Sequence, residues 1–337
     1  MDVPLLVADS YDRGEPHNQS AAQVPTPRAQ GIVCVLRYVC LALVIFHFPS
    51  QLYGQFTDPR TYDNTPVGVN QLELIYAYAH ANASIDTSLI VAGAEVKLNQ
   101  GTPYFTRYFS FIRRLAWLQA SVPLAGLDGS VNGTNIHVSS TGTGDSSYQF
   151  AMLLKGGPAL SVAKFGSYKP TTTIGASLTI TAPTGLYHPD RLLNLGSNRW
   201  SFKPEFAVSH PFGPKQKWEF DGYANAYFYT DNTAYHGNET FRQQPLPGLE
   251  GHISYSFTPS LWASLDTRYS FGGDTFVNGM NQNNAQQNFI MGSEVNISLD
   301  SRNSLVFEFA KALVHQNGPT ITGFAVKYFF SWGKGYR

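Results

Sequence analysis

Residues 261–271, LWASLDTRYSF, alternate between apolar and polar side chains, and this stretch decides the fold. One phase holds Leu261, Ala263, Leu265, Tyr269 and Phe271, and the other holds Trp262, Ser264, Asp266, Arg268 and Ser270. Successive side chains of a β-strand point to opposite faces. The stretch therefore predicts a strand with one apolar and one polar face.

The same alternation recurs along the chain, clearly at 173–181, 200–208, 218–228 and 249–257. After Gln55 no long helical pattern appears. We expect about twelve antiparallel strands, an even number as bacterial barrels require. They begin near Asn70, Tyr104, Ala116, Ser147, Thr172, Arg199, Lys217, Pro247, Leu261, Gln287, Ser304 and Thr320. Lys311 falls on the apolar phase of its strand, and a β-bulge there is one explanation.

Composition favours a membrane barrel over a soluble β-sandwich. Charged residues make up 14% of the chain and aromatic residues 14%, and the net charge is zero. The polar phase is rich in Ser, Thr, Asn and Tyr with paired charges, whereas the outer face of a sandwich usually carries many lysines. The expected fold is all-β, a transmembrane antiparallel β-barrel in the bacterial outer membrane. Its expected partners are outer-membrane lipid, small-molecule solutes and the barrel-assembly machinery, and a neutral chain excludes nucleic acid.

Connection lengths support this topology. Long polar loops at 83–102, 132–146, 185–198, 231–244 and 272–286 mostly take turns with short connections, as extracellular loops and periplasmic turns do. The connection at 156–170 is long where a short turn is expected, and residues 159–168 within it could form one periplasmic helix.

The N-terminus has the layout of a secretory signal. Arg28 and Arg37 precede an apolar run at 38–48, which is short for a spanning helix, although a membrane anchor is the alternative. We expect a disordered leader plus signal peptide at 1–54, a periplasmic segment at 55–69, the barrel at 70–332 and a tail at 333–337. Cleavage near Gln55 would remove Cys34 and Cys40, which leaves no disulfide and no cysteine zinc site.

Inward-phase residues are the candidates for a constriction that selects solutes. They are Lys203, Glu205, Glu219, Asp221, Tyr223, Tyr227, Glu250, Asp266, Arg268 and Glu294. The charges could equally form a salt-bridge network that fills a narrow lumen. Tyr223 and Tyr227 could stack on an aromatic solute or only pack the interior.

A second candidate site is the loop at 185–198. Asp190, Arg191, Asn194, Asn198 and Arg199 could form a plug or a solute gate. The alternative is a loop whose own fold is held by hydrogen bonds between Asp and Arg, since such residues commonly organise turns.

An enzyme is not expected. Some twelve-stranded barrels are lipases, but His80 and Ser293, which have the apolar phase, lie on strands that would not touch. We expect no cofactor and no metal, because His137, His188 and His236 lie in separate loops.

Four motifs resemble a known outer-membrane family. They are APTG at 182–185, PDRLLNLGSNRWSFKPE at 189–205, FYTDN at 228–232 and LWASLD at 261–266. They are similar to the family labelled "putative MetA-pathway of phenol degradation", over roughly residues 66–332. The resemblance implies a porin-like channel for passive uptake or export of small aromatic or apolar molecules. The alternatives are a structural or adhesive barrel and, more remotely, an outer-membrane lipase.

Overall fold

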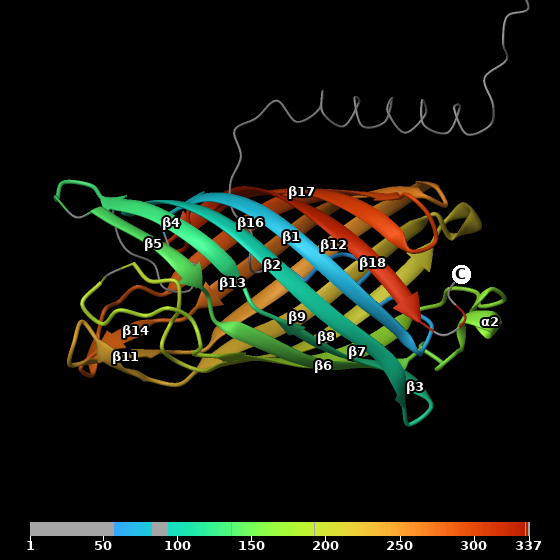
Figure 1. Ribbon diagram of the computed structural model, residues 1–337, viewed down its shortest axis with the longest axis horizontal. Helices are drawn as coiled ribbons and strands as arrows, with labels where there is room; N and C mark the ends of the chain where they lie inside the picture. The colour runs from blue at the N-terminus through green and yellow to red at the C-terminus, as the bar shows by residue number, and fades with distance from the viewer. Residues whose placement is uncertain (1–56, 83–93, 136, 192, 334, 336–337) are drawn as a thin grey trace, which may run out of the picture. The chain divides into compact units, whose positions relative to one another are not determined.

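A computed structural model describes residues 57–82, 94–135, 137–191, 193–333 and 335. Twelve antiparallel strands close into a barrel, because β1 pairs with β18 on one side and with β2 on the other (Figure 1). The predicted fold is confirmed. Its wall consists of β1 (Val69–Ala81), β2 (Ala94–Phe111), β3 (Arg114–Ser121), β4 (Leu124–Val131), β5 (His137–Thr143), β6 (Ser146–Lys155), β7 (Thr173–Ala182), β8 (Ser201–Phe212), β9 (Trp218–Tyr229), β12 (Leu246–Thr258), β13 (Leu261–Gly272), β16 (Gln286–Ser298), β17 (Asn303–Gln316) and β18 (Thr322–Gly333).

Two of the twelve strands are interrupted. β3 and β4 both pair with β2 and are separated only at Val122 and Pro123. β5 and β6 are separated at Gly144 and Asp145, and they pair with β4 and β3 respectively. Pro123, which cannot donate to a sheet ladder, lies at the first break. On the side of the breaks away from β3 and β6, β4 and β5 pair with each other and continue the wall as a hairpin.

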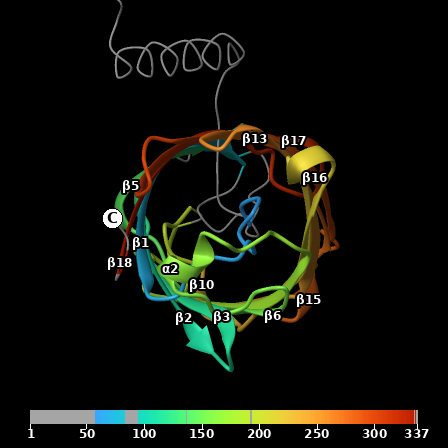
Figure 2. The same cartoon turned by 90° about the vertical axis from the view of Figure 1, so that its right-hand side faces the viewer.

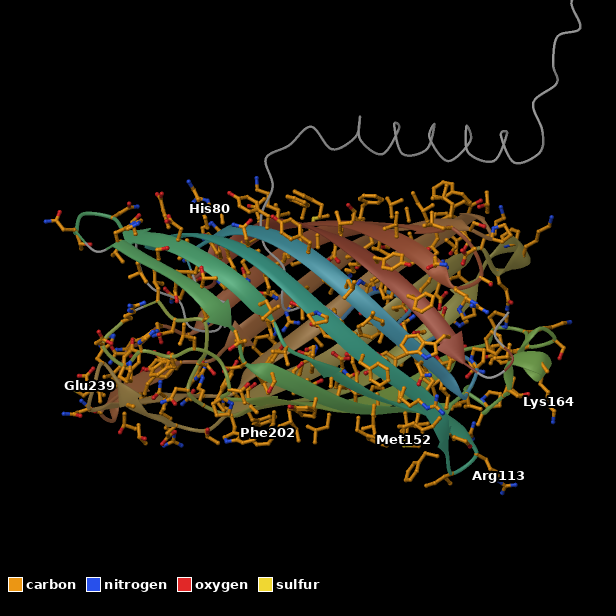
Figure 3. All side chains as sticks on the ribbon, viewed as in Figure 1. His80, Arg113, Met152, Lys164, Phe202 and Glu239 are labelled. Atoms are coloured by element: carbon orange, nitrogen blue, oxygen red, sulfur yellow. The ribbon has the colours of Figure 1, made fainter. Side chains whose placement is uncertain are left out.

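The two faces of the wall follow the predicted phases. Leu265 is 49% exposed on the outer face, whereas its neighbour Ser264 is 8% exposed. Figure 3 shows the outer side chains projecting from the ribbon, among them Met152 and Phe202. An apolar exterior around a polar interior is the arrangement of an outer-membrane barrel, as expected.

The two ends of the barrel differ in their connections. One end has short turns and a single helical turn, α2 (Val162–Phe165), within the connection predicted to hold one helix. The other end carries a small sheet of β10 (Asn232–Tyr235), β11 (Glu239–Gln243), β14 (Thr275–Val277) and β15 (Met280–Asn281). We take the end with short turns, including η1 (Pro214–Gln216), as periplasmic. Among the described residues, no helix has the length and apolarity to cross a membrane.

Three expectations about the wall need correction. β2 begins at Ala94, so residues 94–102 are strand rather than loop, and β5 occupies residues 137–143 of the loop predicted at 132–146. Lys311 faces outward and is exposed, while Ala310 and Ala312 beside it are buried. The bulge in β17 lies beyond Ala312 and does not turn Lys311 inward.

Residues 57–68, here called the lumen segment, lie inside the barrel (Figure 2). The N-terminal segment was predicted to be periplasmic, but its polar groups bond to inward-facing wall side chains instead. It meets the periplasmic end through Val67, whose N–H donates to the Leu160 carbonyl over 2.8 Å. The predicted leader and signal peptide lie outside the described residues.

Candidate functional site

Three layers of different chemistry follow one another along the lumen. An extracellular apolar layer contains Ala81, Val96, Leu98, Ala125, Leu127, Leu193, Leu195, Ile290, Ala310, Ala312 and Ile321. A charged layer occupies the middle. A periplasmic aromatic layer contains Tyr62, Leu115, Trp117, Ala151, Leu153, Ala207 and Tyr223. The charged layer also extends toward the periplasmic end beside the aromatic layer, because buried Glu219 and Asp221 lie nearer the start of β9 than Tyr223 does.

Two ion pairs form the part of the charged layer on β8 to β13. Lys203 Nζ lies 3.0 Å from Glu205 Oε2, and the Arg268 guanidinium binds Glu250. Asn225 links the pairs, because its amide donates to both Glu205 (3.1 Å) and Glu250 (2.8 Å). The strand register causes this, since Glu250 stands opposite Arg268 and Glu205 opposite Asn225.

A buried histidine lies beside these pairs. His252 Nδ1 is 2.8 Å from Asp266 Oδ1, and the Ser264 hydroxyl donates to the other oxygen of Asp266 over 3.0 Å. The His252 ring packs against Tyr223, with centroids 5.1 Å apart. Asp266 is therefore fixed by His252 and Ser264, not by Arg268 two positions along its strand.

Lys327 organises the opposite side of the charged layer. Its ammonium, fully buried, lies 2.7 Å from Asp58, 3.1 Å from Glu294 and 2.6 Å from Glu308. The three carboxylates are grouped closely enough to hold a metal ion. The lysine ammonium lies among them and supplies the positive charge.

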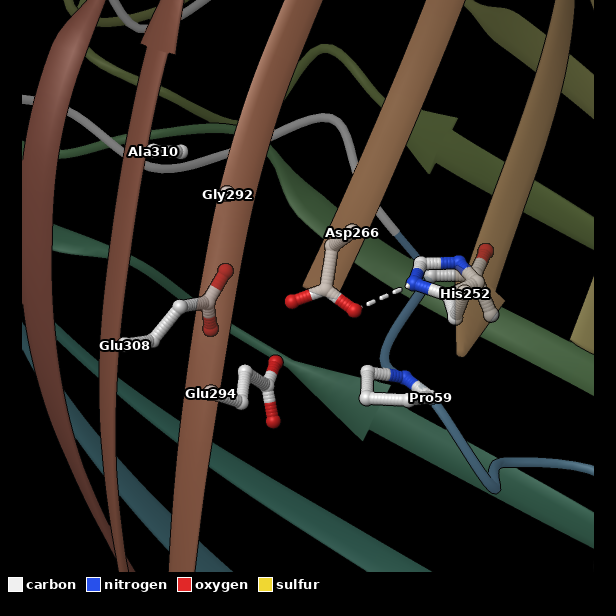
Figure 4. A pocket seen from close by; sticks show the side chains of 8 residues that line it. Pro59, His252, Asp266, Gly292, Glu294, Glu308 and Ala310 are labelled. Atoms are coloured by element: carbon white, nitrogen blue, oxygen red, sulfur yellow. Dashed lines mark hydrogen bonds and ion pairs between the residues drawn. The ribbon is translucent and has the colours of Figure 1, made fainter. Parts of the chain in front are cut away.

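The lumen segment closes the middle of the barrel. Thr57 donates through its N–H to Glu250 and through its hydroxyl to Glu205, each over 2.7 Å. Arg60 lies 3.5 Å from Glu219 and donates to Asp221 through its N–H over 3.1 Å. Figure 4 shows Pro59 of this segment at a pocket that is also lined by His252, Asp266, Glu294 and Glu308.

The predicted lumen residues all face inward. Lys203, Glu205, Glu219, Asp221, Tyr223, Glu250, Asp266, Arg268 and Glu294 are buried. Tyr227 is half-buried, and its ring lies 5.8 Å from Lys203 Nζ and 6.0 Å from the Arg268 guanidinium carbon. Lys327, Glu308 and the whole lumen segment were not predicted from the sequence. Phase alone could have found Lys327, because it alternates with Val326 and Tyr328.

The loop between β7 and β8 folds into the lumen. Leu193 and Leu195 are buried in the extracellular apolar layer. Asp145 fixes the loop, because its carboxylate accepts from the Gly185 N–H (2.8 Å) and from the Ser197 N–H (2.8 Å) and hydroxyl (2.6 Å). Neither Leu193, Leu195, Asp145 nor Ser197 was among the predicted gate residues.

The predicted gate residues have different positions. Asn194 is buried and holds the loop's own turn through the His188 N–H and the Arg191 carbonyl. Arg199 is buried, donates to Gln243 over 2.8 Å and lies 4.0 Å above the Tyr229 ring. Asp190 is exposed.

Asn232 of the small extracellular sheet holds the outer side of this loop. Its side chain accepts from the Asn198 amide over 2.8 Å and donates to the Tyr187 hydroxyl over 2.9 Å. Burial raises the pKa of the Tyr187 hydroxyl. The hydroxyl donates a hydrogen bond to the Ala234 carbonyl over 3.3 Å.

The residues considered for a lipase do not meet. His80 lies on β1 and Ser293 on β16, and β17 and β18 separate these strands in the wall. A Ser–His pair requires hydrogen-bond contact between the two side chains.

Comparison with one solved outer-membrane channel supports the fold. The COG4313 outer membrane channel from Pseudomonas putida F1 superposes with a TM-score of 0.70 at 21% identity, covering 82% of this chain and 100% of that chain. The β domain of the Bordetella autotransporter BrkA gives a TM-score of 0.48 at 11% identity, with 79% and 100% covered. No curated protein sequence matches this chain.

A family model matches residues 79–328, which is well over half of the 337 residues. The matched region extends from β1 to β18 and includes all four motifs noted in the sequence. The chain belongs to the family described as "Putative MetA-pathway of phenol degradation".

Proposed function

We propose that this protein is a passive channel that carries small aromatic or apolar molecules across the outer membrane, by uptake or export. The observation that carries the proposal is the presence of two buried apolar clusters in the lumen, the extracellular apolar layer and the periplasmic aromatic layer. Outer-membrane barrels with water-filled pores have polar interiors. Leu98, Leu127 and Ile290 on one side and Trp117 and Tyr223 on the other would instead favour solutes that leave water easily.

The lumen segment is one barrier that such a solute must pass. Its contacts with the wall are aromatic packing, hydrogen bonds and ion pairs rather than strand pairing, so it can leave without opening the barrel. Cleavage near Gln55, as predicted from the sequence, would place it at the start of the mature chain. We infer no enzymatic role, and we expect the barrel-assembly machinery to insert the chain.

Solute uptake tests the proposal directly. Purified protein is reconstituted into vesicles with lipopolysaccharide in the outer leaflet, which slows passage of apolar solutes through the lipid. We expect phenols and alkylbenzenes to enter faster than sugars of similar size. The control is vesicles without protein. Equal rates with and without protein, or sugars entering as fast as phenols, would exclude this function.

Arg268→Ala tests whether the charged layer selects ions. The change removes the main cationic partner of buried Glu250, which should lower the free energy of unfolding by about 3 kcal/mol. The uncompensated carboxylate should shift the reversal potential in planar bilayers toward cation selectivity. Leu265→Ala on the same strand faces lipid and should leave selectivity unchanged. If the reversal potentials of both variants match that of the wild type, the charges do not select ions and only stabilise the wall.

A further inference from the structure

The side chain of Tyr62 occupies a well-defined place on the barrel wall. Its ring is fully buried, 5.5 Å from Trp117 and 5.5 Å from Tyr223 between ring centroids, at tilts of 59° and 57°. Trp117 is itself fixed, because its indole N–H donates to Gln149 over 3.0 Å. Tilted aromatic neighbours at this separation attract one another beyond simple burial.

The wall is hollowed to receive this ring. Gly175 on β7 faces inward, and a methyl group there would lie 2.2 Å from Cδ1 and 2.7 Å from Cε1 of Tyr62. Such distances exclude any side chain at residue 175 while the ring is in place. Ala151 and Ala207, both buried, belong to the same layer. Small residues thus leave room for one aromatic ring.

The polar end of the site matches a phenol. The Tyr62 hydroxyl lies 2.9 Å from Glu205 Oε1 and 3.0 Å from Ser177 Oγ. An ionised carboxylate can only accept hydrogen bonds, so the Tyr62 hydroxyl donates its hydrogen bond to Glu205. The Ser177 hydroxyl can then donate a hydrogen bond to the Tyr62 oxygen. The site therefore offers both an acceptor and a donor to one hydroxyl group.

Glu205 stays in position without the lumen segment. Its Oε2 receives Lys203 (3.0 Å) and Asn225 (3.1 Å) from the wall, besides the Thr57 hydroxyl. The described contact of Oε1 is the Tyr62 hydroxyl. An aromatic hydrocarbon without a hydroxyl would leave this buried oxygen without a donor, which is costly.

We propose that Trp117, Gly175, Ser177, Glu205 and Tyr223 form a binding site for monophenols, which Tyr62 occupies when no solute is present. The tyrosine side chain is chemically 4-methylphenol, so a free phenol can make the same contacts. The proposal rests on the channel function proposed above, since a solute in the lumen passes this wall. Solute and Tyr62 exclude each other, and tethering gives Tyr62 a high effective concentration.

The test removes the Tyr62 ring from the site by mutation and then offers a small aromatic compound in its place. Tyr62→Ala in the full chain is heated in detergent with millimolar 4-methylphenol or toluene. A ligand that binds only the folded barrel raises its unfolding midpoint. We expect 4-methylphenol to raise the midpoint of Tyr62→Ala clearly and that of the wild type little. Toluene should bind the variant about tenfold more weakly, because Glu205 lacks its donor.

Two variants control the result. Thr57→Ala loosens the lumen segment but leaves Tyr62 in place, so it should respond as the wild type does. Adding Gly175→Val to Tyr62→Ala fills the ring position and should abolish the response. If Tyr62→Ala does not fold alone, refolding it with each compound gives the same answer: recovery with 4-methylphenol but not toluene supports the site.

Equal responses of Tyr62→Ala and Thr57→Ala, or of the two compounds in Tyr62→Ala, would overturn the proposal. Uptake by vesicles, measured in parallel, separates the two hypotheses. Normal uptake without a specific response excludes only the phenol site. A specific response without uptake excludes the channel.

Discussion

Lys327→Met is expected to lower the free energy of unfolding by about 3–5 kcal/mol, the cost of leaving buried charges without their partner. The lysine is fully buried, and three carboxylates, Asp58, Glu294 and Glu308, lie within 3.1 Å of its ammonium. Methionine fills similar space but supplies no charge. Urea unfolding in detergent, followed by the shift of the folded barrel on unheated gels, measures the loss.

Lys311→Met is the matched control. Lys311 lies on the neighbouring strand but is exposed on the outer face, so its loss should change stability by no more than about 0.5 kcal/mol. Adding Glu308→Gln to Lys327→Met removes one of the surplus carboxylates and should restore part of the stability. Equal stability of the two lysine variants would mean that the carboxylates are protonated or solvated and do not depend on Lys327.

Deleting residues 57–66 is expected to increase single-channel conductance several-fold. The deletion removes Thr57, Asp58, Arg60 and Tyr62 and keeps Val67, which attaches the chain at the periplasmic end. Among the buried side chains of the described wall strands, eight are Asp or Glu and three are Lys or Arg. They are Glu73, Glu205, Glu219, Asp221, Glu250, Asp266, Glu294 and Glu308 against Lys203, Arg268 and Lys327. The opened pore should therefore strongly prefer cations.

A replacement of residues 57–66 by a segment of the same length distinguishes the loss of their contacts from the shortening of the chain. Residues 57–66 replaced by glycine and serine should also conduct well, because the chain is present but its contacts are gone. Lys164→Ala in the exposed α2 should behave as the wild type does. Gels should first show that the deletion variant is folded. If its single-channel conductance then equals that of the wild type, the lumen segment is not a barrier.

The alternation of apolar and polar residues predicted most of the wall, because the face on which a strand residue lies depends only on its position within the strand. In β13, Leu265 meets lipid and Asp266 meets the lumen, and neither depends on distant residues. The prediction failed where the phase reverses. At the start of β2, Glu95 and Lys97 point outward while Val96 and Leu98 are buried inside. This part of the wall has a polar outer face, so it resembles a polar loop.

The candidate site was predicted only in part, for a related reason. Phase identified the inward charges on β8 to β13, because their partners stand opposite them in the ladder. The lumen segment has no periodicity, and Thr57 meets Glu250 across 193 positions of sequence. Such a contact depends on the closed barrel. In the loop between β7 and β8, only polar residues were predicted to form a gate. Leu193 and Leu195, which occupy the lumen, were not predicted.

The lumen segment also has a consequence for the order of folding. Its partners include Glu205 on β8, Glu250 on β12 and Lys327 on β18, the last wall strand in chain order. These groups come together only when β18 has paired with β1. The ends of such long loops meet slowly, because closing them costs chain entropy before any contact forms. Docking of residues 57–68 is therefore a late event, and protection of this segment from protease reports that the barrel has closed in the correct register.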